Sequence, residues 1–259
     1  MFRWTEHRSG GQNTCVDSAI AKAFGLLDAM SLAKGPSRLS ALAASLGLQK
    51  STVHRILGEL IDLGFVEQDV ATGMYRPTLR TWEIGTAVVA DLPVKQVAAT
   101  TLHQLHTATG ETVSLSVRSG DDALYLDKLV SPRPRRFTTR VGSRVPLPVV
   151  ASGTMLLAHA PDAEEVVRRV AVRPGLHGRL DVDRALAAIA EARGRGWAAT
   201  SARPGVVSIA AAVIDRDGAP VAALSVSAPT DRLPPAARDE VVEAVVAAAT
   251  TLSESLGRL

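Results

Sequence analysis

The sequence has few cysteines, few aromatic residues and no long apolar runs, and each shortage argues against a class of protein. Among 259 residues there is one cysteine, and aromatic residues make up 3%. Cys15 alone cannot form an internal disulfide, and no Cys/His set has structural-zinc spacing, so no metal is expected. No apolar run reaches the roughly 18 residues of a membrane span, so no membrane partner is expected. So few rings argue against a single-strand nucleic-acid binder that stacks bases.

Charge is nearly balanced, with 29 Lys+Arg against 26 Asp+Glu and a net charge of +3. The pI near 9.3 fits nucleic-acid binding, but so weak an overall field requires a localised binding element. Residues 1–14 are polar and lack the apolar core of a signal peptide. They predict a flexible tail, and the protein is expected to be cytoplasmic.

Residues 15–78 have the pattern of a winged helix-turn-helix domain. Apolar spacing and breaking glycines predict three helices and two short strands, with helices over 17–30, 37–48 and 49–63 and strands over 65–67 and 74–76. The order is helix, tight turn, helix and a two-stranded wing. In such a domain the second helix of the motif enters the major groove of DNA.

Polar and basic residues gather where a helix-turn-helix contacts DNA. The candidates are Arg38, Ser40, Gln49, Lys50, Ser51, Thr52, His54 and Arg55. Lysine and arginine bind phosphates or guanine, glutamine pairs with adenine, and hydroxyls reach either bases or phosphates. The opposite helix face is expected to be buried through Val53, Ile56, Leu57 and Leu60. The alternative is an ordinary three-helix core with a solvated polar turn.

The rest of the chain reads as a connector followed by an α+β domain. Residues 79–93 predict a linker helix that ends at Pro93, and 94–259 predict the second domain. Helical patterns cover 94–109, 151–159, 163–170, 182–193 and 234–256, and strand patterns cover 113–117, 123–130, 206–214 and 220–226. The last two strands flank Asp215-Arg216-Asp217-Gly218, which predicts a hairpin turn and hence antiparallel pairing.

No catalytic motif is present. The chain has no G-x-S-x-G elbow, Walker loop or dinucleotide fingerprint, so neither an enzyme nor a cofactor is expected. His103 and His106 share a helix face without a third ligand, and are interpreted as surface residues. The turn at 215–218 lacks the later ligands of a calcium loop. The basic segment 132–136 fits a solvated loop, an acid-binding loop or a non-specific DNA contact.

Four motifs in the same order resemble the IclR family of bacterial transcription regulators. Residues 48–57 match its recognition-helix signature, and 142–147 with 151–153, 205–211 and 223–227 match its effector-domain signatures. The resemblance covers 15–259. It implies a C-terminal GAF-like effector-binding domain with an antiparallel sheet, and a homodimer or dimer of dimers.

The resemblance also implies that the C-terminal domain binds a small organic acid or related metabolite. The candidate ligand-binding residues are Ala151, Ser152, Gly153, Ser208, Ser225 and Ser227. Free N–H groups at a helix start favour a carboxylate, and serines on apolar strands suit a pocket with few polar anchors. In the alternative interpretation, Ser152 only caps its helix and the other serines only pack.

The sequence departs from the family pattern within the effector domain. Thr154 stands where the family usually has lysine, and Pro148 where it usually has histidine. The segment 196–205 is about two residues short and carries Arg203 near the position of a typical glutamate. The protein is expected to be a repressor that binds double-stranded operator DNA, with an affinity for that DNA that an organic acid modulates. The alternative is a DNA-binding regulator whose C-terminal domain only oligomerises.

Overall fold

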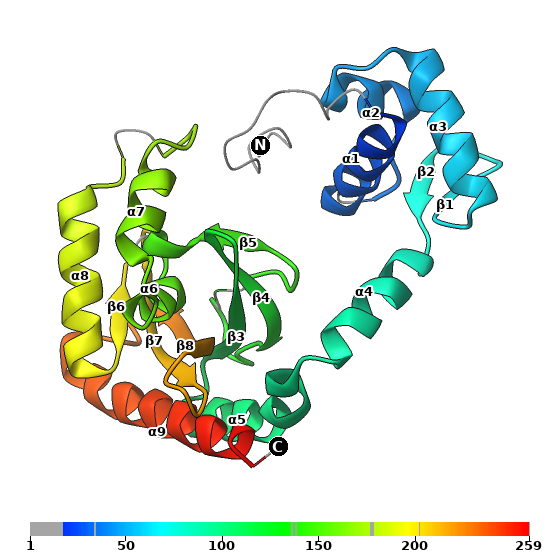
Figure 1. Ribbon diagram of the computed structural model, residues 1–259. Coiled ribbons are helices and arrows are strands. Elements are labelled where there is room, and N and C mark those ends of the chain that lie inside the picture. The colour runs from blue at the N-terminus through cyan, green and yellow to red at the C-terminus, as the bar shows by residue number, and fades with distance from the viewer. Residues whose placement is uncertain are drawn as a thin grey trace. The chain divides into compact units, whose positions relative to one another are not determined.

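The computed structural model describes residues 18–33, 35–135, 137, 139–176, 179–201 and 203–258. The chain divides into two compact units, Met1–Val88 and Val89–Leu259 (Figure 1). The predicted tail at 1–14 and Cys15 lie outside the described residues. The pattern-based α+β fold class is confirmed, as the contents of each unit show.

The first unit is a three-helix domain with a β-wing. It contains α1 (Ala19–Leu32), α2 (Leu39–Leu46), α3 (Lys50–Asp62), β1 (Val66–Gln68), β2 (Tyr75–Pro77) and most of α4 (Arg80–Ala90). Ser18 caps α1 by accepting a hydrogen bond from the Ala21 N–H at 3.1 Å. Gly47 ends α2 with a φ of +64°, a left-handed conformation that glycine adopts without strain and that makes the tight turn before α3.

A single apolar core fixes the angle between α2 and α3. Side chains of α1, α2, α3 and the wing meet there, and the largest that are fully enclosed are Leu26, Ile56 and Leu57. The wing strands pair antiparallel, and the backbone of Ser37 pairs with Tyr75 through hydrogen bonds of 2.8 and 2.9 Å. The wing is therefore tied to the segment that leads into α2.

The second unit is built on a six-stranded antiparallel sheet. Its strands, in the order β5-β4-β3-β8-β7-β6, are β3 (Thr112–Ser119), β4 (Asp122–Leu129), β5 (Arg144–Pro146), β6 (Ala198–Thr200), β7 (Val206–Ile214) and β8 (Pro220–Pro229). Its helices are α5 (Pro93–Thr109), α6 (Ala151–Ala158), α7 (Ala163–Ala171), α8 (Val182–Arg195) and α9 (Arg238–Leu256), with one-turn 3-10 helices at Leu147–Val149 and Pro235–Ala237.

Helices cover both faces of this sheet. Helices α5 and α9 lie on one side of the sheet, and α6, α7 and α8 lie on the other (Figure 1). Each group of helices shares a core with one set of alternating strand residues. On β8, Leu224 and Val226 enter the α5/α9 core. Because successive strand residues point to opposite faces, Ser225 and Ser227 face the α6 side. This alternation brings the predicted serines to one layer.

Two short strands were missed by the sequence interpretation. β5 lies beyond the basic segment 132–136, and β6 precedes the segment that holds Arg203. Each is three residues long, which is too short to show a clear alternation. The hairpin at 215–218 is confirmed: Asp215 Oδ1 accepts from the N–H groups of Asp217 and Ala219 at 3.0 and 2.8 Å.

Ion pairs fasten α7 to the β3–β4 turn. Arg118 makes two hydrogen bonds to the Asp162 carboxylate at 2.7 and 2.6 Å. Arg169 donates to Asp121 at 2.8 Å, and Arg173 donates to Asp122 at 2.7 Å. The hydrogen bond from Arg169 lowers the pKa of Asp121, and the one from Arg118 lowers the pKa of Asp162.

These two carboxylates predict acid sensitivity in the second unit. A folded-state pKa below the ordinary 3.8 adds stability above that pH, and the gain is lost as pH falls through the lowered pKa. We therefore expect their contribution to stay constant from pH 7 to 5 and to fall below about pH 4. Urea unfolding across this range should show a smaller acid loss in Asp162→Asn than in the parent. An equal loss in both would contradict the assignment.

Candidate functional site

The amino-terminal half of α3 presents a polar surface above a buried face. Gln49, Lys50, Ser51, His54 and Arg55 are exposed, and Thr52 is half-buried. Val53, Ile56, Leu57 and Leu60 are buried beneath them, as the sequence predicted. Gln49 makes no side-chain capping bond at the start of this helix. The first-turn N–H groups therefore have no side-chain cap to occupy them and can face a phosphate.

Arg55 already has a partner on its own helix. Its Nη1 lies 2.5 Å from Glu59 Oε1, and the two side chains are 60% and 54% exposed. Ion pairs of this kind between exposed residues four positions apart contribute about 0.3–0.5 kcal/mol. So weak a pair leaves Arg55 available to a stronger anionic partner.

Arg38 and Ser40 extend this polar surface to the start of α2. Both are exposed, and Arg38 occupies the N-cap position of α2 without a side-chain capping bond. The eight DNA-contact candidates thus lie at the amino-terminal ends of two adjoining helices. Whether they contact DNA stays a prediction.

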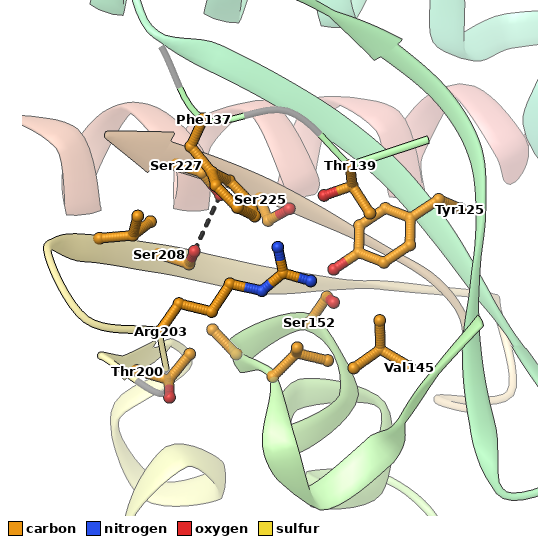
Figure 2. A pocket seen from close by; sticks show the side chains of 13 residues that line it. Tyr125, Phe137, Thr139, Val145, Ser152, Thr200, Arg203, Ser208, Ser225 and Ser227 are labelled. Atoms are coloured by element: carbon orange, nitrogen blue, oxygen red, sulfur yellow. Dashed lines mark hydrogen bonds between the residues drawn. The ribbon is translucent and has the colours of Figure 1, made fainter. Parts of the chain in front are cut away.

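The second unit contains a small pocket between the sheet and the start of α6 (Figure 2). Its free volume is about 40 Å³. A water needs about 10–15 Å³ by such a measure, so the pocket as it stands admits only a very small group. It is lined by Tyr125, Phe137, Thr139, Val145, Val150, Ala151, Ser152, Thr200, Arg203, Val206, Ser208, Ser225 and Ser227.

Ser152 is an unpartnered hydroxyl at the wall of this pocket. The residue is 1% exposed, and its Oγ makes no hydrogen bond of normal geometry. The capping interpretation of Ser152 is wrong, because Val150 is the N-cap of α6 and no side chain caps that helix. A buried hydroxyl without a partner costs about 1–3 kcal/mol, so a ligand oxygen that reached it would recover that energy.

Gly153 lies in the same turn but does not line the pocket. A Cβ built on it would lie 2.1 Å from the Leu147 carbonyl oxygen and 2.6 Å from the Leu147 Cα. Only glycine permits this approach of α6 to the preceding 3-10 helix. The structure therefore gives Gly153 a packing role and places Ala151 and Ser152, but not Gly153, on the pocket wall.

The other three predicted serines share the sheet side of the pocket. Ser208 and Ser227 join β7 to β8 through a hydrogen bond of 2.8 Å between their hydroxyl oxygens. Ser225 is buried and also lines the pocket. Figure 2 shows the hydroxyls of Ser152 and Ser225 directed towards the space into which Arg203 reaches. These serines form a polar wall in an otherwise apolar layer.

Eight pocket residues escaped the sequence interpretation as site residues, among them Tyr125, Phe137, Thr139 and Arg203. Burial raises the pKa of Tyr125, and the nearby Ser152 and Thr139 hydroxyls and the Arg203 charge offset part of this rise. Tyr125 is therefore neutral at pH 7 and retains a proton to donate. The guanidinium of Arg203 lies 4.8 Å from the centre of the Phe137 ring.

Several of the remaining sequence candidates have structural partners. His106 Nδ1 lies 2.8 Å from the Glu111 carbonyl oxygen. In the basic segment, Arg133 pairs with Glu111 and Arg135 pairs with Asp231, whereas Arg136 lies outside the described residues. Arg133 and Arg135 thus hold the segment to the domain.

Within the described part of the chain, no helix is long and apolar enough to cross a membrane.

A winged helix-turn-helix followed by a second, α+β domain is typical of a transcription regulator. Comparison with protein families agrees. The IclR helix-turn-helix domain matches residues 19–70, and the model described as bacterial transcriptional regulator IclR C-terminal matches residues 86–254. The chain belongs to the IclR family of transcriptional regulators.

The alignments with individual relatives cover most of the chain. The "probable transcriptional regulator SauR" of Cupriavidus necator is 32% identical over 223 residues, which cover 84% of this chain and 88% of SauR. The transcriptional repressor AllR of Escherichia coli is 30% identical over 83% of this chain and 81% of its own. The structure of an IclR homologue from Microbacterium hydrocarbonoxydans in complex with 4-hydroxybenzoate aligns with a TM-score of 0.79 and 26% identity. The alignment covers 93% of this chain and 100% of the homologue.

Proposed function

We propose that the protein is a sequence-specific repressor that binds double-stranded operator DNA and whose affinity a small organic acid modulates. The exposed polar face of α3, held on a buried core, carries this proposal. The unpartnered Ser152 and the cationic Arg203 in one pocket support the effector, and the relative solved with 4-hydroxybenzoate shows an acid bound in a related protein. We propose that residues 15–78 bind DNA, that residues 79–93 form the linker and that residues 94–259 bind the effector. We also propose that the protein acts in the cytoplasm, where its operator DNA would lie.

Apolar side chains on the first unit support pairing with a second copy of the chain. Ile20 and Phe24 on α1 and Leu79, Trp82 and Val88 in and beside α4 are each exposed by 60% or more. No residue of α4 is buried. Such a helix gains stability by packing on an identical partner. A homodimer, alone or within a dimer of dimers, would present two recognition helices to a pseudo-palindromic operator.

The effector would act by favouring one arrangement of the paired DNA-binding domains. A ligand shifts a conformational equilibrium only by the difference between its affinities for the two states. The pocket lies against α6 and strands β4, β7 and β8, so effector contacts bear on the whole second unit. The acid is proposed to favour the spacing that fits the operator less well.

Arg55→Ala tests the recognition helix. Loss of a base or phosphate contact is expected to weaken operator binding by about 1–3 kcal/mol, or roughly 5- to 150-fold. Glu59→Gln is the matched control, because it frees Arg55 from its ion pair and should leave binding unchanged or tighter. Fluorescence anisotropy on an operator duplex obtained by selection from random DNA measures both. Equal affinity of Arg55→Ala and the parent across a salt series would count against this helix.

Ser152→Asp tests the pocket. A fixed carboxylate beside Arg203 would repel an acid, so the variant is expected to bind operator normally and to lose its response to the acid. Ser152→Ala is the control, since it removes only the hydroxyl and should weaken the response without abolishing it. The measurement is operator affinity with and without the acid. A normal response in Ser152→Asp would remove the pocket from the effector role.

A second candidate function is a DNA-binding regulator whose C-terminal domain only oligomerises. The small free volume of about 40 Å³ favours it, because ligand pockets commonly exceed about 300 Å³. A ligand that binds only the folded state raises the unfolding temperature. A thermal shift with any organic acid would therefore exclude this candidate.

A further inference from the structure

Two segments without regular structure meet across the pocket. Phe137 lies between β4 and β5, and Arg203 lies between β6 and β7. The Arg203 guanidinium is 4.8 Å from the Phe137 ring centre, within the range of a cation–π interaction. Figure 2 shows the same guanidinium directed towards the Tyr125 and Ser152 hydroxyls. One side chain thus joins two separate loops and also reaches the innermost polar groups of the pocket.

Arg203 gives the pocket its positive charge. Among the described residues that line it, Arg203 alone is charged, and the other polar groups are hydroxyls. Tyr125 adds no negative charge, because burial raises its pKa. The start of α6 adds partial positive charge from its first-turn N–H groups. The Arg203 charge, the Tyr125 and Ser152 hydroxyls and the start of α6 therefore favour a single anionic group placed among them.

We propose that Arg203 is the specificity-determining residue of the effector site and that, with Phe137, it forms a clasp that an anionic effector holds closed. This inference rests on the proposed effector function. An effector carboxylate would accept hydrogen bonds from the edge of the Arg203 guanidinium. The flat face of the guanidinium would stay on the Phe137 ring, since arginine can stack and form an ion pair at the same time. The carboxylate would then link the Phe137 loop, the Arg203 loop and α6.

The small free volume allows an opposite interpretation, in which Arg203 fills the pocket and must leave before anything binds. The two interpretations predict opposite effects of shortening this side chain. If Arg203 selects the anion, its removal weakens acid binding. If Arg203 is only a plug, its removal strengthens the binding of charged and neutral ligands alike.

Two matched pairs of probes test the clasp in the full-length protein. Lactate against lactamide and benzoate against benzamide differ in charge but little in shape. Isothermal titration is used for each probe on the parent and on Arg203→Gln, Arg203→Lys and Phe137→Leu. Arg216→Gln, in the exposed β7–β8 turn outside this pocket, controls for loss of one positive charge. Unfolding temperatures without ligand should stay within about 2 °C of the parent.

The expected result is that the parent prefers one or both acids over the amides, and that Arg203→Gln loses about 10- to 100-fold in acid affinity and most of that preference. Arg203→Lys should lose less, because it keeps the charge without the planar fork. Phe137→Leu should lose about two- to fivefold and keep the preference for acids. Arg216→Gln should match the parent.

The failures are separable. Acid binding with the same strength and preference in the parent and Arg203→Gln would overturn the clasp and leave the proposed function intact. Tighter binding of acids and amides alike by Arg203→Gln would also overturn the clasp, in favour of the plug. Absence of binding by the parent to all four probes would overturn the effector function and the clasp with it, whereas operator binding would be measured independently.

Discussion

Gly153→Ala is expected to destabilise the second unit by about 3 kcal/mol or more. Inserted methyl groups in packed cores commonly cost about 1–3 kcal/mol when side chains can move aside. Here the added Cβ would meet backbone, with the Leu147 carbonyl oxygen 2.1 Å away. Alanine's better helix propensity, worth about 1 kcal/mol, offsets only part of that cost. Because Ser152 precedes this residue, the pocket wall would shift as well.

A second glycine in the same unit provides the control. Gly194 lies inside α8, and a Cβ there would have nothing within 4 Å. Gly194→Ala should therefore be neutral or stabilising by up to about 1 kcal/mol. Urea unfolding followed by circular dichroism compares the two variants with the parent. A Gly153→Ala protein as stable as the parent would show that α6 does not pack on Leu147 in this way.

Glu111→Ala is expected to destabilise the second unit by about 3 kcal/mol. The Glu111 side chain is 3% exposed and accepts hydrogen bonds from Arg232 at 2.7 and 2.8 Å and from Arg133 at 2.9 Å. Removing one member of a buried ion pair leaves its partner uncompensated, at a cost of about 3–5 kcal/mol. The lower end applies because Arg232 is 19% exposed and keeps some contact with water.

The same change should disturb the pocket. Arg232 also donates to the Pro134 carbonyl oxygen at 2.9 Å, so Glu111 and Arg232 together hold the segment that leads to Phe137. Asp231→Asn is the control, since it breaks a pair with Arg135 that is exposed to water and therefore contributes little. Chemical denaturation of both variants gives the comparison. Similar stability losses in the two variants would contradict a special role for the buried carboxylate.

The recognition helix could be predicted closely because its information is local. Apolar residues at helical spacing place Val53, Ile56 and Leu57 on one face, so the polar residues between them had to be exposed. Gly47 marks the turn for an equally local reason. The wing and the β7–β8 hairpin follow from short-range turn patterns in the same way.

The pocket could be predicted only in part because its residues come from distant segments. Alternation along β8 places Ser225 and Ser227 on one face, but nothing local shows that Tyr125, Phe137 and Arg203 converge on them. A register shift between β3 and β4 beside Tyr125 further obscures which face that residue occupies. The packing role of Gly153 could not be predicted, because it depends on the contact with Leu147 that forms only in the folded chain. The Glu111–Arg232 pair, formed across 121 positions, has no sequence signal of its own.

Fluorescence anisotropy on duplex DNA tests whether α3 reads operator DNA. The purified protein is titrated with the duplex upstream of its own gene and with a scrambled duplex, at several salt concentrations and with and without an organic acid. We expect tight binding to the native duplex, a clear preference over the scrambled one, and weakening with salt as counterion release requires. Failure to bind either duplex at low salt would contradict it.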